Sequence, residues 1–288
     1  MKKKTMAALA LGALMMSQTV FADAQVGDEI VSLGADLSPA QKQMMLQNFG
    51  AHEGAQILEV TNREEHEALD GIVPVAQVGR KALSSVMMVT KEPGSGLKVI
   101  VDPTITYIGE ATYRDALITA GVTDATIHVG APMKVSGTAA LTGIFKAYET
   151  SSGKKIPKDL KRIANEELVI TEEIFKKEEG TKASDIMNTI KAEVAEKNLK
   201  DPEEVKVLIQ NITNHYEVRL TDAQVERLAD LFVRMQETEV DWDQVRAQTE
   251  KYSERVKNYL NSDEGKEMVE NSKSFIRAFL DWLKSFFE

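Results

Sequence analysis

The chain has 288 residues, 43% of them apolar, and a formal net charge of −10 from 35 Lys and Arg against 45 Asp and Glu. This length and apolar content are enough for one large or two ordinary domains with a buried core. The absence of cysteine excludes disulfides, thiol nucleophiles, thiolate metal sites and a lipid-modified N-terminal cysteine. The acidic balance and the lack of long basic runs after position 4 argue against a nucleic-acid partner.

Residues 1–24 have the three parts of a secretory signal peptide. Lysines at positions 2–4 precede an apolar stretch at 5–17, and small residues around Ala22 and Ala24 offer a cleavage site. The apolar stretch is shorter than the roughly 20 residues that span a bilayer, so cleavage is favoured over a membrane anchor. We therefore expect a secreted, extracytoplasmic protein. Without cysteine or an LPxTG-like motif, we expect neither a lipid nor a sortase anchor.

Residues 26–150 are predicted to form an α/β domain, because short β-branched runs alternate with helical patterns. The predicted strands are 29–33, 56–60, 84–90, 97–102 and 125–130, and the predicted helices are 39–49, 63–69, 110–120 and 138–150. A breaker-rich turn at residues 91–96 predicts that the third and fourth strands pair as an antiparallel hairpin. The sheet should therefore be mixed rather than doubly wound and parallel.

Residues 156–288 are predicted to be helical, because apolar residues recur every three or four positions and β-branched runs disappear. Asp201 and Thr221 have the sequence context of helix N-caps. The polar segment at 150–157 separates the two compositions, so we place the domain junction there. The predicted fold class is an N-terminal α/β domain with a mixed sheet, followed by an all-helical C-terminal region.

The sequence lacks the short motifs of the common hydrolases and nucleotide-binding proteins. It contains no HExxH zinc motif, no G-x-S-x-G serine motif, and no glycine spacing that matches a P-loop or a dinucleotide fingerprint. The four scattered histidines are interpreted as structural or surface residues; they are His52, His66, His128 and His215. We expect no metal site and no cofactor. A glycosidase-like pair of carboxylates stays open, because the separation that matters is spatial.

The most distinctive segment is 130–143, where a strand ends, a loop turns and a helix of small residues begins. Free N–H groups at Ser136, Gly137 and Thr138 could hold a carboxylate or phosphate, with Ser136 or Thr138 as the helix cap. We favour an alternative in which the small residues of this segment only let the helix pack closely on the sheet; these are Ala139, Ala140 and Gly143.

Asp102 ends a predicted strand near this loop. If the protein is an enzyme, Asp102, Ser136 and Thr138 are its candidate catalytic residues. An Asp that precedes proline, however, is more often a turn former than a catalyst. A compact pocket that joins these three residues with another carboxylate would favour an enzyme, whereas a shallow, filled surface there would favour binding.

Residues 275–288 are rich in aromatic side chains. As a helix, this segment would carry one apolar stripe of Phe275, Phe279, Trp282, Leu283 and Phe286. We weigh three roles for the stripe: packing on the helical region, binding in a partner's groove, and peripheral contact with a membrane. The mixed charges on the other face, in place of a basic one, weaken the case for a membrane.

Three segments carry a resemblance to a known family: VSLGADLSPAQ at 31–41, ALITAGVTDA at 116–125 and VSGTAALTGIFKAYE at 135–149. Together they resemble the YpuA-like family of secreted Firmicute proteins, a domain of unknown function (DUF1002). The resemblance covers nearly the whole mature chain, including the helix start at 220–224. It implies an exported Gram-positive protein but no activity, cofactor or catalytic residue.

The leading hypothesis is a non-enzymatic, envelope-associated binding or adaptor protein. Its α/β domain would present the Ser136 loop, and its helical region would engage an envelope protein or a wall polymer. The alternative is a secreted hydrolase that acts on a cell-wall polymer or a phosphoester.

Overall fold

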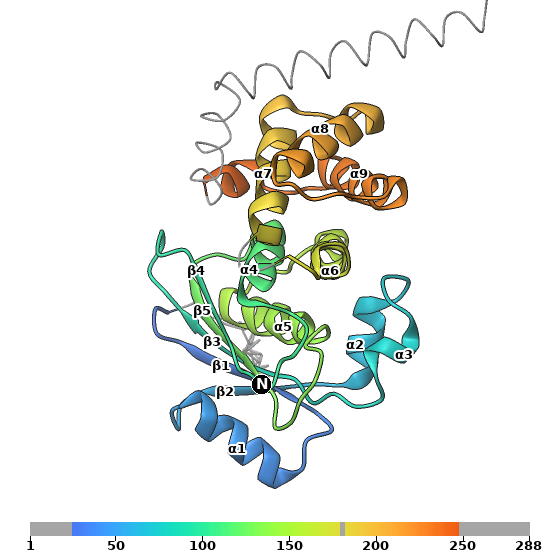
Figure 1. The fold of residues 1–288 in the computed structure, drawn as a ribbon. Helices are drawn as coiled ribbons and strands as arrows, with labels where there is room; N and C mark the ends of the chain where they lie inside the picture. The colour runs from blue at the N-terminus through green and yellow to red at the C-terminus, as the bar shows by residue number, and fades with distance from the viewer. Residues whose placement is uncertain (1–24, 179–181, 248–288) are drawn as a thin grey trace, which may run out of the picture.

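The computed structural model describes residues 25–178 and 182–247. The predicted signal peptide and the predicted aromatic helix at 275–288 lie outside the described residues. In the described part, five strands form one sheet: β1 (Glu29–Gly34), β2 (Gln56–Val60), β3 (Ser85–Thr90), β4 (Leu97–Val101) and β5 (Ala125–Gly130). The first helices, α1 (Pro39–Phe49), α2 (Asn62–Leu69), α3 (Val75–Val78), α4 (Glu110–Thr119) and α5 (Ala140–Ser152), surround this sheet (Figure 1). The chain then continues through α6 (Lys158–Phe175), α7 (Lys182–Lys197), α8 (Pro202–His215) and α9 (Asp222–Glu237), with a further helical stretch at residues 242–247.

The sheet is mixed, as predicted, with the strand order β2-β1-β3-β5-β4. The central strand β3 is antiparallel to both of its neighbours, while β1 pairs with β2, and β4 with β5, in parallel. The predicted hairpin is wrong, because β5 lies between β3 and β4 and pairs with both. The turn at 91–96 reverses the chain, but it does not place β4 next to β3. Ile127 and Val129 of β5 are wholly buried, so β5 occupies an interior position in the sheet and β4 lies at the edge.

Helices cover both faces of the sheet. In Figure 1, α1 lies on one face, and α4 and α5 lie on the other. Successive side chains of β1 point to opposite faces of the sheet. Val31 and Leu33 pack with α1. Ser32 lies on the other face, where its Oγ donates a hydrogen bond to the carbonyl of Gly143 on α5 at 3.0 Å. A Cβ at Gly143 would lie only 3.4 Å from the Cβ of Ser32. Gly143 therefore lets α5 pack closely on the sheet.

Two of the predicted helix caps are present in the structure, and one is not. The hydroxyl of Thr221 accepts from the N–H of Gln224, and Asp201 accepts from two backbone N–H groups, as predicted. At α5, by contrast, the N-cap is Ala139, with no side-chain hydrogen bond. The prediction of a Ser136 or Thr138 cap is wrong, because an extra turn precedes the helix and the N–H of Ala140 is already bonded to the carbonyl of Gly137 at 2.9 Å.

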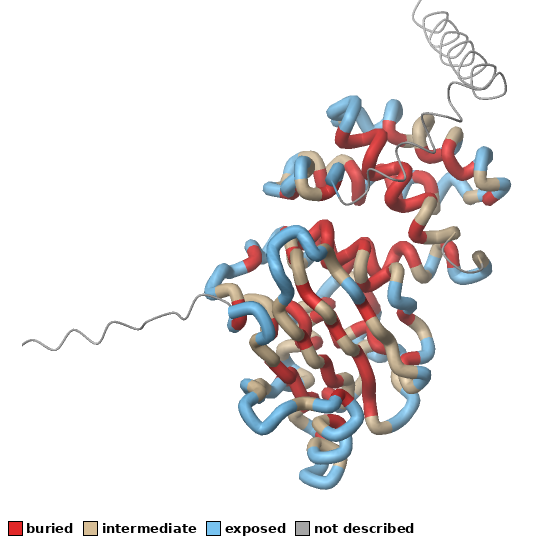
Figure 2. Tube along the Cα trace, turned by 90° about the vertical axis from the view of Figure 1, so that its left-hand side faces the viewer, coloured by how far each residue is buried: buried red, intermediate tan, exposed pale blue. Residues whose placement is uncertain are grey.

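The buried apolar core continues from the sheet into the helical region. Leu117 on α4, Ile144 on α5, Leu168 on α6 and Phe232 on α9 belong to one cluster and have no exposed surface. Figure 2 shows the corresponding run of buried residues from the sheet into the helices above it. The predicted domain junction falls in the short link between α5 and α6. The same core includes residues from both sides of this link. Among the described helices, none is both long and apolar enough to cross a membrane.

Glu65 on α2 is an acidic residue inside the protein. Its side chain accepts a hydrogen bond from Nδ2 of Asn62 at 3.1 Å, and only 2% of the residue is exposed. The pKa of Glu65 is raised from 4.5 to about 7. Burial is the main cause, the hydrogen bond from Asn62 opposes the rise, and the neighbouring carboxylates of Asp36 and Glu64 add to it.

We predict that Glu65 makes the fold less stable as pH rises from 4.5 to about 7. The folded state binds the proton more tightly than the unfolded chain, so the Glu65 contribution is fully present at the acidic end of this window. Relative to Glu65→Gln, the wild type should lose about 3 kcal/mol across the window. Urea denaturation at several pH values measures this difference. Parallel pH profiles for the two proteins would contradict it.

Candidate functional site

The Ser136 loop packs onto the protein through Gly137 and Thr138. Ser136 is exposed, whereas Gly137 and Thr138 are buried. The hydroxyl of Tyr113 donates to the carbonyl of Gly137 at 2.5 Å, and a Cβ at Gly137 would lie 2.5 Å from Cγ2 of Ile105. Gly137 also has a φ of +89°, which favours glycine. The space beside Gly137 is therefore filled by Tyr113 and Ile105.

Asp102 lies in a different polar cluster, on the α1 side of the sheet. Its Oδ1 lies 2.7 Å from Nε2 of His128, and its Oδ2 accepts from Nδ2 of Asn48 at 2.6 Å. The Phe49 ring contacts the His128 ring, with 4.8 Å between centroids. The Asp102 and His128 side chains are each 18% exposed. Among the described residues, no hydrogen bond joins Asp102 to Ser136 or Thr138.

His128 was interpreted from the sequence as a structural or surface residue, and its pairing with Asp102 was not predicted. The two meet because β4 and β5 are parallel neighbours, with Ile100 opposite His128. The predicted hairpin placed β3 beside β4 and so hid this pairing. One signal was present in the sequence: His128 is a titratable residue between the apolar Ile127 and Val129 of a predicted strand.

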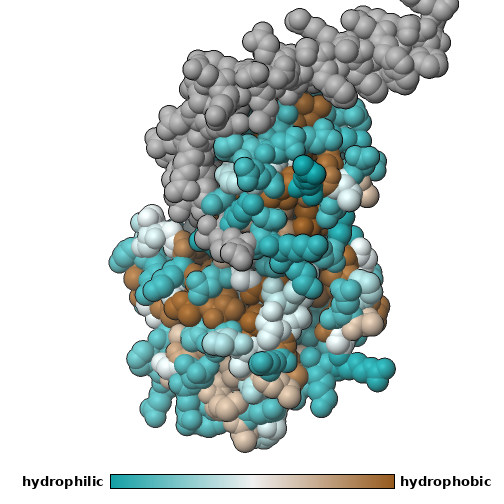
Figure 3. Space-filling view, in the orientation of Figure 1, coloured by the Kyte–Doolittle hydropathy of each residue, from teal (hydrophilic) through white to brown (hydrophobic). Residues whose placement is uncertain are grey.

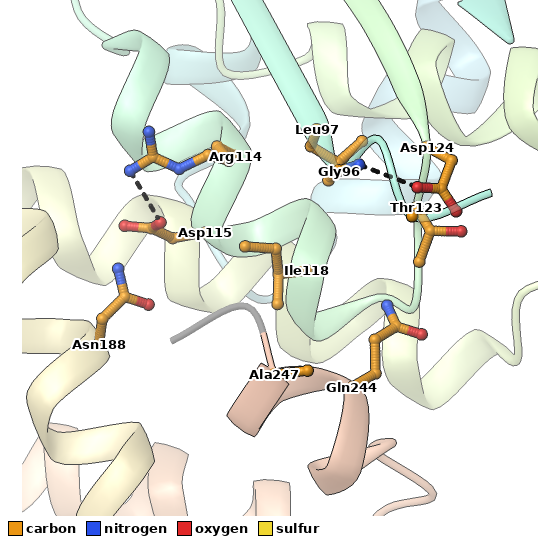
Figure 4. A pocket seen from close by; sticks show the side chains of 11 residues that line it. Gly96, Leu97, Arg114, Asp115, Ile118, Thr123, Asp124, Asn188, Gln244 and Ala247 are labelled. Atoms are coloured by element: carbon orange, nitrogen blue, oxygen red, sulfur yellow. Dashed lines mark hydrogen bonds and ion pairs between the residues drawn. The ribbon is translucent and has the colours of Figure 1, made fainter. Parts of the chain in front are cut away.

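A pocket of about 510 Å³ lies where the turn before β4, helices α4 and α7, and the last described residues meet. We call it the junction pocket (Figure 4). Its walls are formed by Gly94, Gly96, Leu97, Arg114, Asp115, Ile118, Thr123, Asp124, Asn188, Gln244 and Ala247. Figure 3 shows hydrophobic residues gathered on this face between the sheet and the upper helices. The volume is in the range of small-molecule sites.

Two polar atoms in the walls of the junction pocket are buried without a hydrogen-bond partner among the described residues: Oδ1 of Asn188 and Nε2 of Gln244. Figure 4 shows Asn188 and Gln244 on opposite sides of the pocket, with Ile118 between them. Leaving such an atom unpaired costs about 1–3 kcal/mol. A ligand that donates to Asn188 and accepts from Gln244 would offset this cost.

The Asn188 side of the pocket is anchored by hydrogen bonds around Asp115, of which only 3% is exposed. Ser184 donates to its carboxylate, and NH2 of Arg114 lies 3.4 Å from Oδ1 of Asp115 and 3.3 Å from Oγ of Ser184. Asn188 Nδ2 donates to the same Ser184 hydroxyl at 3.1 Å. These bonds hold the Asn188 amide and the Arg114 guanidinium in fixed positions at the pocket.

Beneath this network lies an ion pair between Lys191 on α7 and Glu167 on α6, each only 1% exposed. Nζ of Lys191 also donates to the carbonyl of Asp115 on α4 at 3.0 Å, and the Thr119 hydroxyl donates to Glu167 at 2.6 Å. Burial raises the pKa of Glu167 above its ordinary value, and the charge of Lys191 opposes this rise. The ion pair therefore fixes α4, α6 and α7 relative to one another, and with them the two walls of the junction pocket that α4 and α7 form.

Lys191→Met should lower the free energy of unfolding by about 3–5 kcal/mol, because it leaves the carboxylate of Glu167 buried without its cation. The double variant Glu167→Met with Lys191→Met should be more stable than Lys191→Met alone, since it removes both buried charges. Chemical denaturation of the wild type, the single variants and the double variant measures the coupling. Strictly additive effects would show that the two side chains do not stabilise each other.

Comparisons with known proteins identify the family but no activity. The sequence profile of the family described as "Protein of unknown function (DUF1002)" matches residues 33–252. The chain is similar to "Uncharacterized protein YpuA" of Bacillus subtilis (strain 168), with 39% identity over 284 residues that cover 98% of each chain. No solved structure matches significantly. The resemblance drawn from the sequence is confirmed: the chain belongs to the DUF1002 family of proteins of unknown function.

Proposed function

We propose that this protein is exported and binds a component of the cell envelope without catalysing a reaction on it. The single observation that carries the binding proposal is the pair of unpartnered polar atoms in the junction pocket, on Asn188 and Gln244. Export is supported by the basic start, the apolar stretch and the small residues of positions 1–24. A binding role is supported by the two carboxylates of the junction pocket, which are both held by hydrogen bonds within the protein: Asp115 accepts from Ser184, and Asp124 accepts from the N–H of Gly96.

The ligand chemistry follows from the two unpartnered atoms. Asn188 offers a hydrogen-bond acceptor and Gln244 a donor. An amide group presents the complementary pair, one N–H and one C=O. Envelope polymers carry such groups in their acetamido sugars and peptide bonds. The apolar side chains of Leu97 and Ile118 line the same pocket and would contact the carbon atoms beside the amide. We infer that the ligand is an amide-bearing segment of a wall polymer.

Replacing Asn188 tests the junction pocket. We predict that Asn188→Leu weakens binding to isolated cell walls at least about tenfold, because it removes a hydrogen-bonded amide worth roughly 1.4 kcal/mol or more. Cosedimentation of the mature full chain with purified walls gives the affinity. The change should cost only about 1 kcal/mol of stability, since the Asn188 side chain makes one hydrogen bond, to Ser184.

Thr213→Val is the matched control. Thr213 on α8 is also buried, at 2% exposed, and its hydroxyl also donates a hydrogen bond within the protein, to the carbonyl of Ile209 at 2.9 Å, but it lies outside both the junction pocket and the pocket between α2, α5 and α6. Binding to walls should survive this change. Equal losses from both variants, or from neither, would rule out the junction pocket as the site of wall binding.

A hydrolase is the second candidate, and the pairing of Asp102 with His128 is the observation that favours it. A carboxylate that holds a partly exposed imidazole is the usual arrangement of a general base. If the chain cleaves a wall polymer or a phosphoester, His128→Ala and Asp102→Asn should each lower turnover about 100-fold or more. Ser136→Ala should leave turnover unchanged, because no hydrogen bond links Ser136 to the pair in the described structure. Hydrolysis that survives the loss of His128 would exclude this pair from the reaction.

A further inference from the structure

A second pocket, of about 590 Å³, lies between α2, α5 and α6. We call it the lateral pocket, and it shares no lining residue with the junction pocket. Figure 1 shows these three helices next to one another on the face of the sheet opposite α1. The floor contains Phe145, which is 2% exposed, and the walls are strongly polar. The lateral pocket therefore combines a size suited to a small ligand with many polar groups.

Two polar side-chain atoms in the lateral pocket lack hydrogen-bond partners. Oγ1 of Thr142 on α5 and Oδ1 of Asn165 on α6 are both buried, and neither has a hydrogen bond among the described residues. Asn165 is 1% exposed and is held by one bond, from its Nδ2 to the carbonyl of Lys161 at 2.9 Å. An amide oxygen can only accept, so what it lacks is a donor. A ligand hydroxyl can supply that donor, and the Thr142 hydroxyl can pair with a second one.

The lateral pocket has a slight excess of positive charge, whereas the whole chain is negative. Five cationic and four acidic side chains line it, against a net charge of −10 for the protein. Most of these charges are already paired: Lys146 contacts Glu64 at 2.6 Å, and Lys161 contacts Glu149 at 2.7 Å. Lys158 and Asp159 are both exposed, and neither has an ion pair within the described residues. The ammonium group of Lys158 is therefore available to an anion that enters the pocket, although the neighbouring carboxylate of Asp159 opposes its attraction.

We propose that the lateral pocket binds a small anion that also carries hydroxyl groups, such as a polyol phosphate or a sugar acid. The hydroxyl groups donate to Asn165 Oδ1 and pair with Thr142, and the anionic group lies against Lys158. An uncharged polyol gains nothing from Lys158. An inorganic anion without protons cannot satisfy the acceptor on Asn165. Both features in one molecule are needed for tight binding.

Calorimetric titration of the mature full chain at low salt tests this proposal. The probes are glycerol 3-phosphate and gluconate, and the matched fragments are glycerol and inorganic sulfate, which carries no proton at neutral pH. We expect at least one of the two probes to bind about tenfold or more tightly than either fragment. The preferred probe distinguishes a phosphate from a carboxylate ligand. Fragments that bind as well as both probes, or probes that do not bind, would overturn the proposal.

Thr142→Val is the most informative variant, because it removes a hydroxyl that has no hydrogen-bond partner among the described residues. Its melting temperature should equal or exceed that of the wild type, while its affinity for the preferred probe falls several-fold. Lys158→Gln should weaken binding similarly, whereas Lys154→Gln, at an exposed lysine outside the pocket, should not. Wild-type affinity in both Thr142→Val and Lys158→Gln would overturn the proposal. Asn188→Leu must leave this affinity unchanged, which keeps the test independent of wall binding at the junction pocket.

Discussion

The buried ion pair between Lys191 and Glu167 is the constraint on which the arrangement of the two halves depends. Two charges that are removed from water must remain paired, and here the lysine also needs the Asp115 carbonyl while the glutamate needs the Thr119 hydroxyl. These contacts join α6 and α7 to α4, the helix that crosses between β4 and β5. A rotation of the helical region against the sheet would break several buried hydrogen bonds at once. The junction pocket therefore has fixed walls, although its residues come from distant parts of the chain.

Fixed walls explain why polar atoms can stay unpartnered in both pockets. Asn188 is held through its Nδ2 by Ser184, and Asn165 is held through its Nδ2 by the carbonyl of Lys161. In each case the amide nitrogen is used by the fold and the amide oxygen is left without a donor. A side chain held in this way cannot turn to find another partner. Both pockets thus carry preformed acceptors, which is the property that a binding protein needs.

Local patterns predicted the elements well. The strands at 56–60 and 125–130 and the helix at 39–49 match the structure at both ends, because alternation and capping depend on neighbouring residues. Strand pairing was predicted less well. The turn at 91–96 indicates where the chain reverses but not which strand then lies beside β4, since that depends on which strand buries the most apolar surface. The same error separated Asp102 from His128 in the predicted site.

The sequence by itself determined the class of the protein: an acidic, cysteine-free α/β domain with a mixed sheet, followed by helices, in the DUF1002 family. It also determined the helix starts at Asp201 and Thr221, because a cap is an interaction within four residues. Only the tertiary structure decided which polar side chains meet. Arg114 and Asn188, or Thr142 and Asn165, lie far apart along the chain, and neither pair has a spacing that a motif could reveal. Their proximity results from helix packing and from buried charges that must be paired, and those are properties of the whole fold.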